Sequence, residues 1–328
     1  MLILAGLLGM MALGSIMLIE PSSDHSEDED AEQRDADNLD ADGSFQQVGD
    51  TSTDLLSFID DNGDTQTLPN QETDGDDLLI GTNTADDISG GEGDDNVMAG
   101  GGSDTLDGGR GSDALHGNGG DDFLNGGAGF DALFGDQGSD NLAGGKGDDT
   151  LAGNAGNDLL SGGLGNDSLF GGEGEDVLFG GAGDDTLIGS SGNDLFSGGA
   201  GQDLIFAGTG DDVLEGWENA DHSADSLNGG DGNDTIFAGA TDEVSGGDGA
   251  DSIVLQPDTP EQVRIWDFES GLDTLVVLYD ADSDAPDLTI SESPETDDEW
   301  FVQANGETVA LVSGDAPAMS DITLMQRA

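Results

Sequence analysis

Residues 90–107 read GGEGDDNVMAGGGSDTLD, which is two nine-residue blocks of nearly the same pattern. Each block is rich in glycine at its start, has Asp at its sixth position and has one large apolar residue at its eighth. The nine-residue spacing continues without a gap from residue 72 to residue 215. A fixed short period is typical of a solenoid, in which each repeat packs only against its neighbours.

The sixth position is Asp in every block of this uninterrupted run. Residues 216–228 then carry a four-residue insertion, residues 229–237 return to the pattern, residues 238–245 lose one residue, and residues 246–254 close the array. We take the sixth-position aspartates as candidate metal ligands. They are Asp77, Asp86, Asp95, Asp104, Asp113, Asp122, Asp131, Asp140, Asp149, Asp158, Asp167, Asp176, Asp185, Asp194, Asp203, Asp212, Asp234 and Asp251.

The block pattern also predicts how the chain is folded. The last three residues of a block can form a short strand, in which the eighth side chain points inward and its neighbours point outward. The first six residues must then turn the chain, and glycine suits such a turn because it tolerates positive φ. Two blocks make one coil, so we expect a thin apolar core between two sheets.

The charge of the chain is extreme for a folded protein. It has 73 acidic and five basic residues, a formal net charge of -68, and no Cys. Self-repulsion of this size opposes a compact state unless cations neutralise it, and it argues against binding to nucleic acid. Without Cys, disulfides and thiolate metal sites are excluded.

A core of one large side chain per nine residues is too small to offset the entropy of ordering so much glycine. A divalent cation in each turn would supply the missing stability and neutralise the stacked carboxylates. Six or more hard oxygen ligands, from Asp side chains and turn carbonyls, favour Ca²⁺ over Mg²⁺. The sequence therefore predicts multiple calcium ions as cofactors.

The blocks resemble the RTX (repeats-in-toxin, hemolysin-type) nonapeptide G-G-x-G-x-D-x-U-x, where U is large and apolar. The first six positions are intact in the blocks that start at residues 90, 108, 126, 144, 162, 171, 180, 198, 229 and 246. The resemblance covers residues 72–254. It implies an all-β, right-handed parallel β-roll, calcium bound by the sixth-position aspartates together with backbone oxygens of neighbouring turns, and an exported protein.

The intact blocks from residue 90 to residue 198 recur mainly every 18 residues, which is one full coil. The blocks between them usually relax one glycine. We therefore expect the two edges of the roll to differ, with the stricter edge holding calcium more tightly.

Residues 1–19 carry no charged side chain and are long enough for a helix that just crosses a bilayer. We expect an uncleaved membrane anchor; an atypical signal peptide or an apolar tail outside a membrane are the alternatives. Residues 20–71 are acidic with few large apolar residues, which predicts a disordered linker.

Residues 255–328 are expected to form a small β cap on the last coil, with a hairpin around Asn305-Gly306. Within them, residues 265–277 read IWDFESGLDTLVV, which is similar to the segment that follows the repeats in many RTX proteins. That resemblance implies type I secretion through a C-terminal signal, with the export machinery as a partner.

The leading interpretation is a calcium-binding, non-enzymatic protein of structural or adhesive type, extracellular or on the cell surface, with possible tethering through residues 1–19. The alternative is an RTX enzyme or toxin fragment whose activity lies outside the repeats. The chain contains no H-E-x-x-H or G-x-S-x-G motif. Only about fifty residues of an acidic, low-complexity segment lie between the apolar segment and the repeats, where relatives carry a catalytic domain.

Overall fold

The computed structural model describes residues 58–59, 65–66, 74–217, 223–256, 262–280, 284–294, 296 and 298–327. Chain contacts divide the protein into residues 1–50 and residues 51–328, and the first unit lies outside the described residues. The predicted apolar helix and most of the predicted linker therefore lie outside them too. The linker region contributes one described antiparallel pair, β1 (Phe58–Ile59) with β2 (Thr65–Gln66). None of the helices in the described part could cross a membrane.

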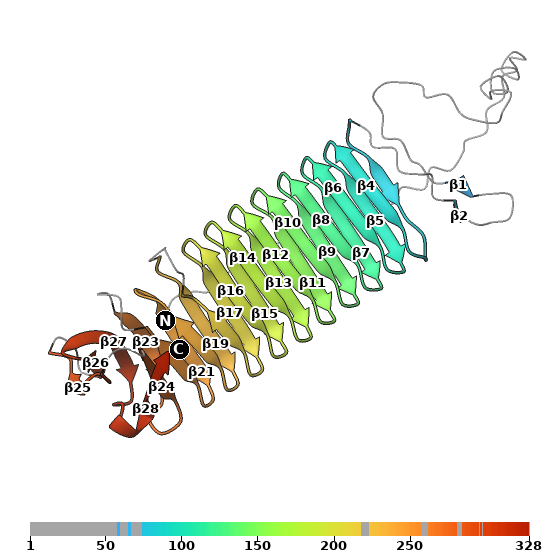
Figure 1. The fold of residues 1–328 in the computed structure, drawn as a ribbon. Helices are drawn as coiled ribbons and strands as arrows, with labels where there is room; N and C mark the ends of the chain where they lie inside the picture. The colour runs from blue at the N-terminus through green and yellow to red at the C-terminus, as the bar shows by residue number, and fades with distance from the viewer. Residues whose placement is uncertain are drawn as a thin grey trace, which may run out of the picture. The chain divides into compact units, whose positions relative to one another are not determined.

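The repeats form two sheets of parallel strands, which alternate along the chain (Figure 1). The odd-numbered sheet contains β3 (Leu78–Ile80), β5 (Asn96–Gly101), β7 (Ala114–Gly119), β9 (Ala132–Gln137), β11 (Thr150–Ala155), β13 (Ser168–Glu173), β15 (Thr186–Ser191), β17 (Leu204–Thr209), β19 (Ser226–Asp231), β21 (Glu243–Asp248) and β23 (Val263–Phe268). The even-numbered sheet contains β4 (Asp87–Glu92), β6 (Thr105–Arg110), β8 (Phe123–Ala128), β10 (Asn141–Lys146), β12 (Leu159–Leu164), β14 (Val177–Ala182), β16 (Leu195–Ala200), β18 (Val213–Glu215), β20 (Thr235–Ala238), β22 (Ser252–Leu255) and β24 (Thr274–Asp280).

Each strand pairs with the strand one coil away, at a constant separation of 18 residues through the regular part of the array. Leu142 pairs with Leu160 in the even sheet, and Leu151 pairs with Leu169 in the odd sheet. Sequence-adjacent strands therefore lie in opposite sheets. This arrangement confirms the predicted all-β parallel roll.

The predicted boundary between strand and turn within each nine-residue block was wrong. Most strands of the array run for six residues, from the seventh position of one block to the third position of the next, as in β12 (Leu159–Leu164). The turn is confined to the fourth to sixth positions. The reason is that the leading glycines can pair across coils, as Gly145 does with Gly163.

The fourth-position glycine is required by the close stacking of the turns. Gly111 has a φ of +134°, and a Cβ added to it would collide with the carbonyl oxygen of Gly93 in the preceding coil. Any side chain here would force successive coils apart, and this explains why glycine fills the fourth position of nearly every block.

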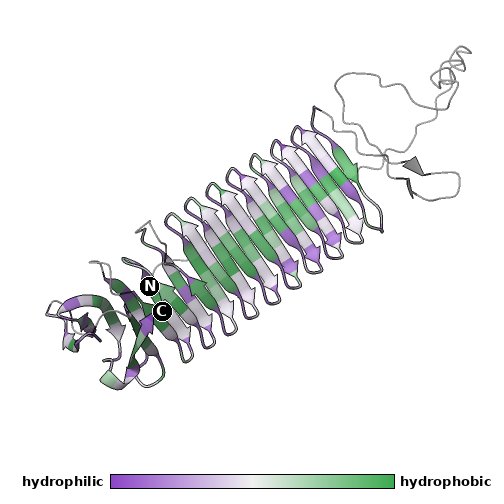
Figure 2. Cartoon of the chain, viewed as in Figure 1, coloured by the Kyte–Doolittle hydropathy of each residue, from purple (hydrophilic) through white to green (hydrophobic). Residues whose placement is uncertain are grey.

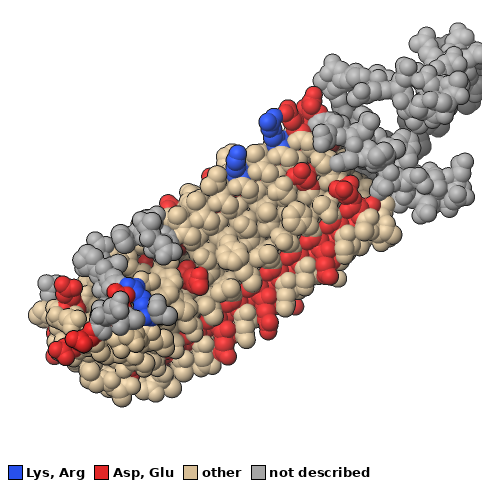
Figure 3. Space-filling model, in the orientation of Figure 1, with Lys and Arg blue, Asp and Glu red and all other residues tan. Residues whose placement is uncertain are grey.

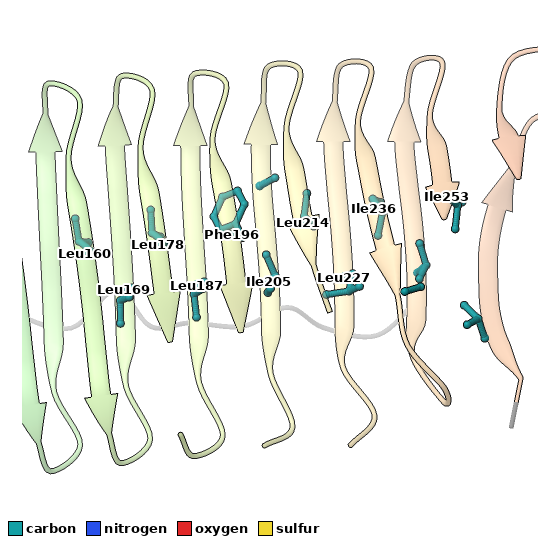
Figure 4. Close-up of a cluster of buried hydrophobic side chains, with 14 of the residues drawn as sticks. Leu160, Leu169, Leu178, Leu187, Phe196, Ile205, Leu214, Leu227, Ile236 and Ile253 are labelled. Atoms are coloured by element: carbon teal, nitrogen blue, oxygen red, sulfur yellow. The ribbon is translucent and has the colours of Figure 1, made fainter. Parts of the chain in front are cut away.

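The core is a double column of eighth-position side chains between the sheets (Figure 4). Leu160, Leu169, Leu178 and Leu187 follow one another along it, and all are fully buried. Phe196 occupies the same position in the next block. Figure 2 shows the resulting hydrophobic band crossing the middle of the strands.

The stacking continues one coil beyond the last nonapeptide. Strand β23 pairs in parallel with β21, and β24 pairs in parallel with β22. The odd sheet then ends in an antiparallel meander of β27 (Glu307–Gly314), β26 (Glu299–Ala304) and β25 (Leu288–Glu292), and the even sheet ends in β28 (Ile322–Arg327), which follows the short 3-10 helix η1 (Met319–Asp321).

The predicted hairpin around Asn305-Gly306 is confirmed. It joins β26 to β27, and both turn residues have positive φ. Mirror-image turns of this kind match the twist of antiparallel strands, which is why Asn-Gly is a strong hairpin signal.

Two neighbouring leucines of β12 test the inward and outward assignment. Leu160→Ala should lower the free energy of unfolding in calcium by about 3 kcal/mol, because it removes a fully buried side chain. Leu159→Ala should change it by less than about 1 kcal/mol, because Leu159 is 37% exposed. Urea unfolding followed by circular dichroism measures both. Equal losses in the two variants would contradict the assigned register.

Candidate metal centre

The sixth-position aspartates lie at the end of each turn, where the chain enters the next strand. They form two columns, one along each edge of the roll, and nearly all are buried. The first edge contains Asp77, Asp95, Asp113, Asp131, Asp149, Asp167, Asp185, Asp203, Asp225 and Asp242. The second edge contains Asp86, Asp104, Asp122, Asp140, Asp158, Asp176, Asp194, Asp212, Asp234, Asp251 and Asp273.

A hydrogen-bond ladder runs through each column. The backbone N–H of each aspartate donates to Oδ1 of the aspartate one coil later, as Asp149 does to Asp167 at 2.8 Å. The donor–acceptor distances span 2.7–3.1 Å on both edges. Since one carboxylate oxygen is held by this bond, the orientation of every carboxylate is set by its neighbouring coil.

The other carboxylate oxygen, Oδ2, is buried and accepts no hydrogen bond along most of both columns. A buried carboxylate oxygen without a donor is costly, so its repetition at turn after turn indicates a missing electropositive partner. The residues concerned are Asp95, Asp104, Asp113, Asp122, Asp131, Asp140, Asp149, Asp158, Asp167, Asp176, Asp185, Asp194, Asp212, Asp234 and Asp251.

At most of these oxygens the first-position residue is a glycine that borders Oδ2 directly, with no side chain between them. A Cβ added to Gly144 would lie 2.5 Å from Oδ2 of Asp149 and 2.8 Å from the carbonyl oxygen of Gly162 in the next coil. At Gly180 the corresponding atoms would both lie at 2.5 Å. A carboxylate oxygen and a carbonyl oxygen of the next coil therefore converge beside the glycine, and both are oxygen ligands of the kind that Ca²⁺ prefers.

These donors suit a hard cation. The described residues contain no group of three or more His, Cys, Asp or Glu side chains around one point. Carboxylate and carbonyl oxygens in combination are the ligands that Ca²⁺ prefers. Three turns carry alanine instead of glycine at the first position, namely Ala99, Ala207 and Ala238, all of them buried. A methyl group takes the place of the glycine hydrogen there.

Burial raises the pKa of most of these carboxyl groups. For Asp149 desolvation is the main cause; the hydrogen bond from Asp131 opposes it, and the charges of Asp131, Asp167 and Asp148 add to it, giving a pKa of about 7. The pKa is likewise raised to about 7 at Asp158, Asp185, Asp212 and Asp242 and to about 6 at Asp113, Asp140, Asp194 and Asp251. A bound cation would offset this penalty and restore the ionised form.

Three further aspartates belong to the ladders but were not predicted from the nine-residue period. Asp203 donates to Asp225, Asp225 to Asp242, and Asp251 to Asp273. The insertion, the deletion and the end of the array hid them, because counting in nines fails at each. Each of the three lies two residues before a buried apolar residue, which is Leu227, Val244 or Leu275, and this spacing identifies them.

A second ladder at the fifth position was also missed. Here the backbone N–H donates in the opposite direction, to the side-chain oxygen one coil earlier. Asn166 donates to Asp148, and Asp184 donates to Asn166, both at 2.9 Å. Where both bonds form, a turn is bonded forward through its sixth residue and backward through its fifth. The pattern G-G-x-G-x-D treats the fifth position as free, so it gave no signal.

The predicted difference between the edges is only partly visible. The ladder distances are the same on both edges, so the aspartates themselves do not distinguish them. The edges differ in the residue type at the second position: the second edge has Asn118, Asp136, Asn154 and Ser190 there, whereas the first edge has glycine over the same coils, and the φ angle is positive on both edges. After the insertion, the intact motifs lie on the second edge, at Asp234 and Asp251. A difference in calcium affinity stays a prediction.

Substitutions at two adjacent residues of one turn test the roles of the two ladders independently. Asp149→Asn keeps an oxygen for the ladder but removes the charge of the unpartnered Oδ2, so it should weaken calcium binding at that turn by about tenfold or more. Asp148→Asn, next to it and exposed, should leave calcium affinity within about twofold. Calorimetric titration of both variants measures this. Equal weakening in both would contradict the assignment of Oδ2 as the ligand atom.

The affinity of the folded roll for calcium should depend on pH. The pKa values are raised in the metal-free roll, so the folded chain holds protons that the unfolded chain releases above about pH 4. Acid therefore stabilises the metal-free roll, and this contribution is lost as the pH rises through about 7. Calcium must displace those protons when it binds to the roll. Below the pKa, the affinity of the folded roll for calcium should therefore fall by about tenfold per pH unit for each proton displaced.

Folding midpoints in calcium, measured at about pH 5 and about pH 8, check the balance of these two effects. The unfolded chain and the calcium-bound roll are both ionised over this range, so the weaker affinity at pH 5 is offset by the acid stabilisation of the metal-free roll, and the midpoint concentration should be about the same or lower at pH 5. A midpoint several-fold higher at pH 5 would contradict raised pKa values in the metal-free roll.

The geometry agrees with a family that matches the chain. The family described as RTX calcium-binding nonapeptide repeat matches residues 73–106, 98–133, 134–169, 161–196, 170–205, 197–222 and 223–253. Together these matches span more than half of the 328 residues. No curated protein matches the chain significantly. With its repeats, its parallel roll and its two columns of buried aspartates, the chain belongs to the RTX calcium-binding nonapeptide repeat family.

Proposed function

We propose that this protein is a calcium-dependent structural element, whose roll folds when calcium enters the two aspartate columns. The observation that carries this proposal is the buried Oδ2 atom that recurs without a hydrogen-bond donor at turn after turn. Oxygens placed so regularly, and each beside a carbonyl oxygen, are a binding surface for a row of hard cations.

Calcium binding and folding are coupled in this arrangement. Successive carboxylates of one column belong to strands about 4.8 Å apart, so their charges repel when they are ionised. The pairs of Oδ2 and carbonyl oxygens exist only when coils are stacked, because the two oxygens come from different coils. Calcium therefore binds the folded state in preference to the unfolded one, and its binding energy becomes folding energy.

The coupling also suggests where the protein acts. In a calcium-poor cytosol the acidic chain would stay unfolded and ready for export, and in calcium-rich surroundings it would fold. Outside the cell, the stacked coils would serve as a stiff spacer or adhesive element rather than as an enzyme. The net charge of -68 supports this proposal, since it opposes folding until cations are bound. A tether through residues 1–19 and export by a type I system belong to the same proposal.

Calcium titration of the full chain, followed by far-UV circular dichroism, tests the function. We expect a cooperative change from coil to β-structure in calcium and none in magnesium at the same concentration, because Mg²⁺ is dehydrated reluctantly. Folding that is complete in a chelator, or equal in the two metals, would contradict a calcium-dependent fold.

A further inference from the structure

The two faces of the roll differ at the ninth position of the block. On the odd sheet this outward column reads Ile80, Met98, His116, Phe134, Ala152, Phe170, Ile188 and Phe206, in register from β3 to β17. On the even sheet the same column, from β4 to β18, reads Ser89, Asp107, Asn125, Ala143, Ser161, Phe179, Ser197 and Glu215. The ninth residue thus tends to alternate between apolar and polar with the 18-residue period of the coil.

The apolar column is exposed. Met98 is 42% exposed, Phe170 is 38% exposed and Phe206 is 41% exposed. His116 stacks on Phe134 with ring centroids 4.6 Å apart, so it extends the aromatic surface. We call the outward face of strands β3–β17 around this column the apolar face. Large exposed apolar patches on soluble folds mark interaction surfaces.

The apolar face is also poor in charged side chains. Its seventh and ninth positions carry no Asp, Glu, Lys or Arg, in a chain with 73 acidic residues. One carboxylate lies against the column: Asp136, at the second position of β9, has Oδ2 3.8 Å from Nδ1 of His116 and accepts a hydrogen bond from Asn118. The even sheet carries Asp87, Asp107 and Glu215 at the equivalent seventh and ninth positions. Figure 3 shows acidic side chains in a row along the lower edge of the roll in this view.

We propose that the apolar face is the interface between two copies of this chain in its calcium-bound state. Eight strands at about 4.8 Å spacing and about 20 Å length give about 750 Å² per copy, close to the roughly 800 Å² per partner of stable complexes. A second copy offers a flat face with the same strand spacing. It also keeps the acidic edges of both copies in solvent, so that few carboxylates are desolvated.

The column is self-complementary in an antiparallel, two-fold arrangement. Such a pair sets β3 against β17 of the second copy, with the axis between β9 and β11. Phe134 then lies opposite Ala152, and His116 lies opposite Phe170. Large side chains meet small ones near the centre, and aromatic rings meet on either side, as two-fold interfaces require of one repeated surface.

Sedimentation equilibrium of the full chain in calcium tests the interface. We expect a species of twice the 33.2 kDa chain mass, and monomer in a chelator. Phe170→Ser should weaken dimerisation by about tenfold or more, because it removes an aromatic ring from the centre of the contact. Serine is the residue at the equivalent positions 161 and 197 of the even sheet, so the roll tolerates it there.

Phe179→Ser is the matched control. Phe179 has the same position in the next block and is 41% exposed, but it lies on the even sheet. It should leave dimerisation unchanged. Association through residues 1–19 would respond equally to both substitutions, so equal effects would overturn the proposal.

This inference rests on calcium-dependent folding, and circular dichroism of the same samples separates the two proposals. A folded chain that stays monomeric at every concentration contradicts the interface alone and leaves the face to a different partner. A chain that stays unfolded in calcium contradicts the proposed function and the interface with it.

Discussion

The structure depends on one interaction, the hydrogen bond from the backbone N–H of each sixth-position aspartate to Oδ1 of the aspartate one coil later. This bond pulls a carboxylate into the interior of every turn and fixes its direction. It also leaves the second oxygen buried with no protein donor. A fold that repeats this arrangement along both edges accumulates buried negative charge, and only protons or cations can neutralise it.

The unusual composition follows from that constraint. Glycine is favoured at the first position because a Cβ there would crowd Oδ2, as at Gly144, and at the fourth because a side chain would strike the preceding coil, as at Gly111. The apolar residues are reduced to a thin double column of eighth-position side chains, such as Leu160 and Leu169. Because this core is thin, the buried carboxylates of the turns, which in most folds are peripheral, weigh heavily on the stability of the whole fold.

Much of this could be predicted from the sequence, because the period is short and each position has one physical task. The invariant Asp, the inward eighth residue and the Asn305-Gly306 hairpin are local signals, and the structure confirms each as a structural element. Asp225 and Asp242 were missed because the count in nines breaks at the insertion and the deletion. The fifth-position ladder and the apolar face were missed because they depend on which residues stack across coils, and one block does not show this.

Anomalous X-ray diffraction from crystals grown in calcium tests the central claim most directly. The account predicts a row of calcium peaks along each edge, about 4.8 Å apart where neighbouring coils are both occupied, each within about 2.3–2.6 Å of an Oδ2 atom of the columns. Peaks that lie instead on the exposed fifth-position carboxylates, such as Asp148, with Oδ2 of Asp149 bonded to protein or water alone, would contradict it.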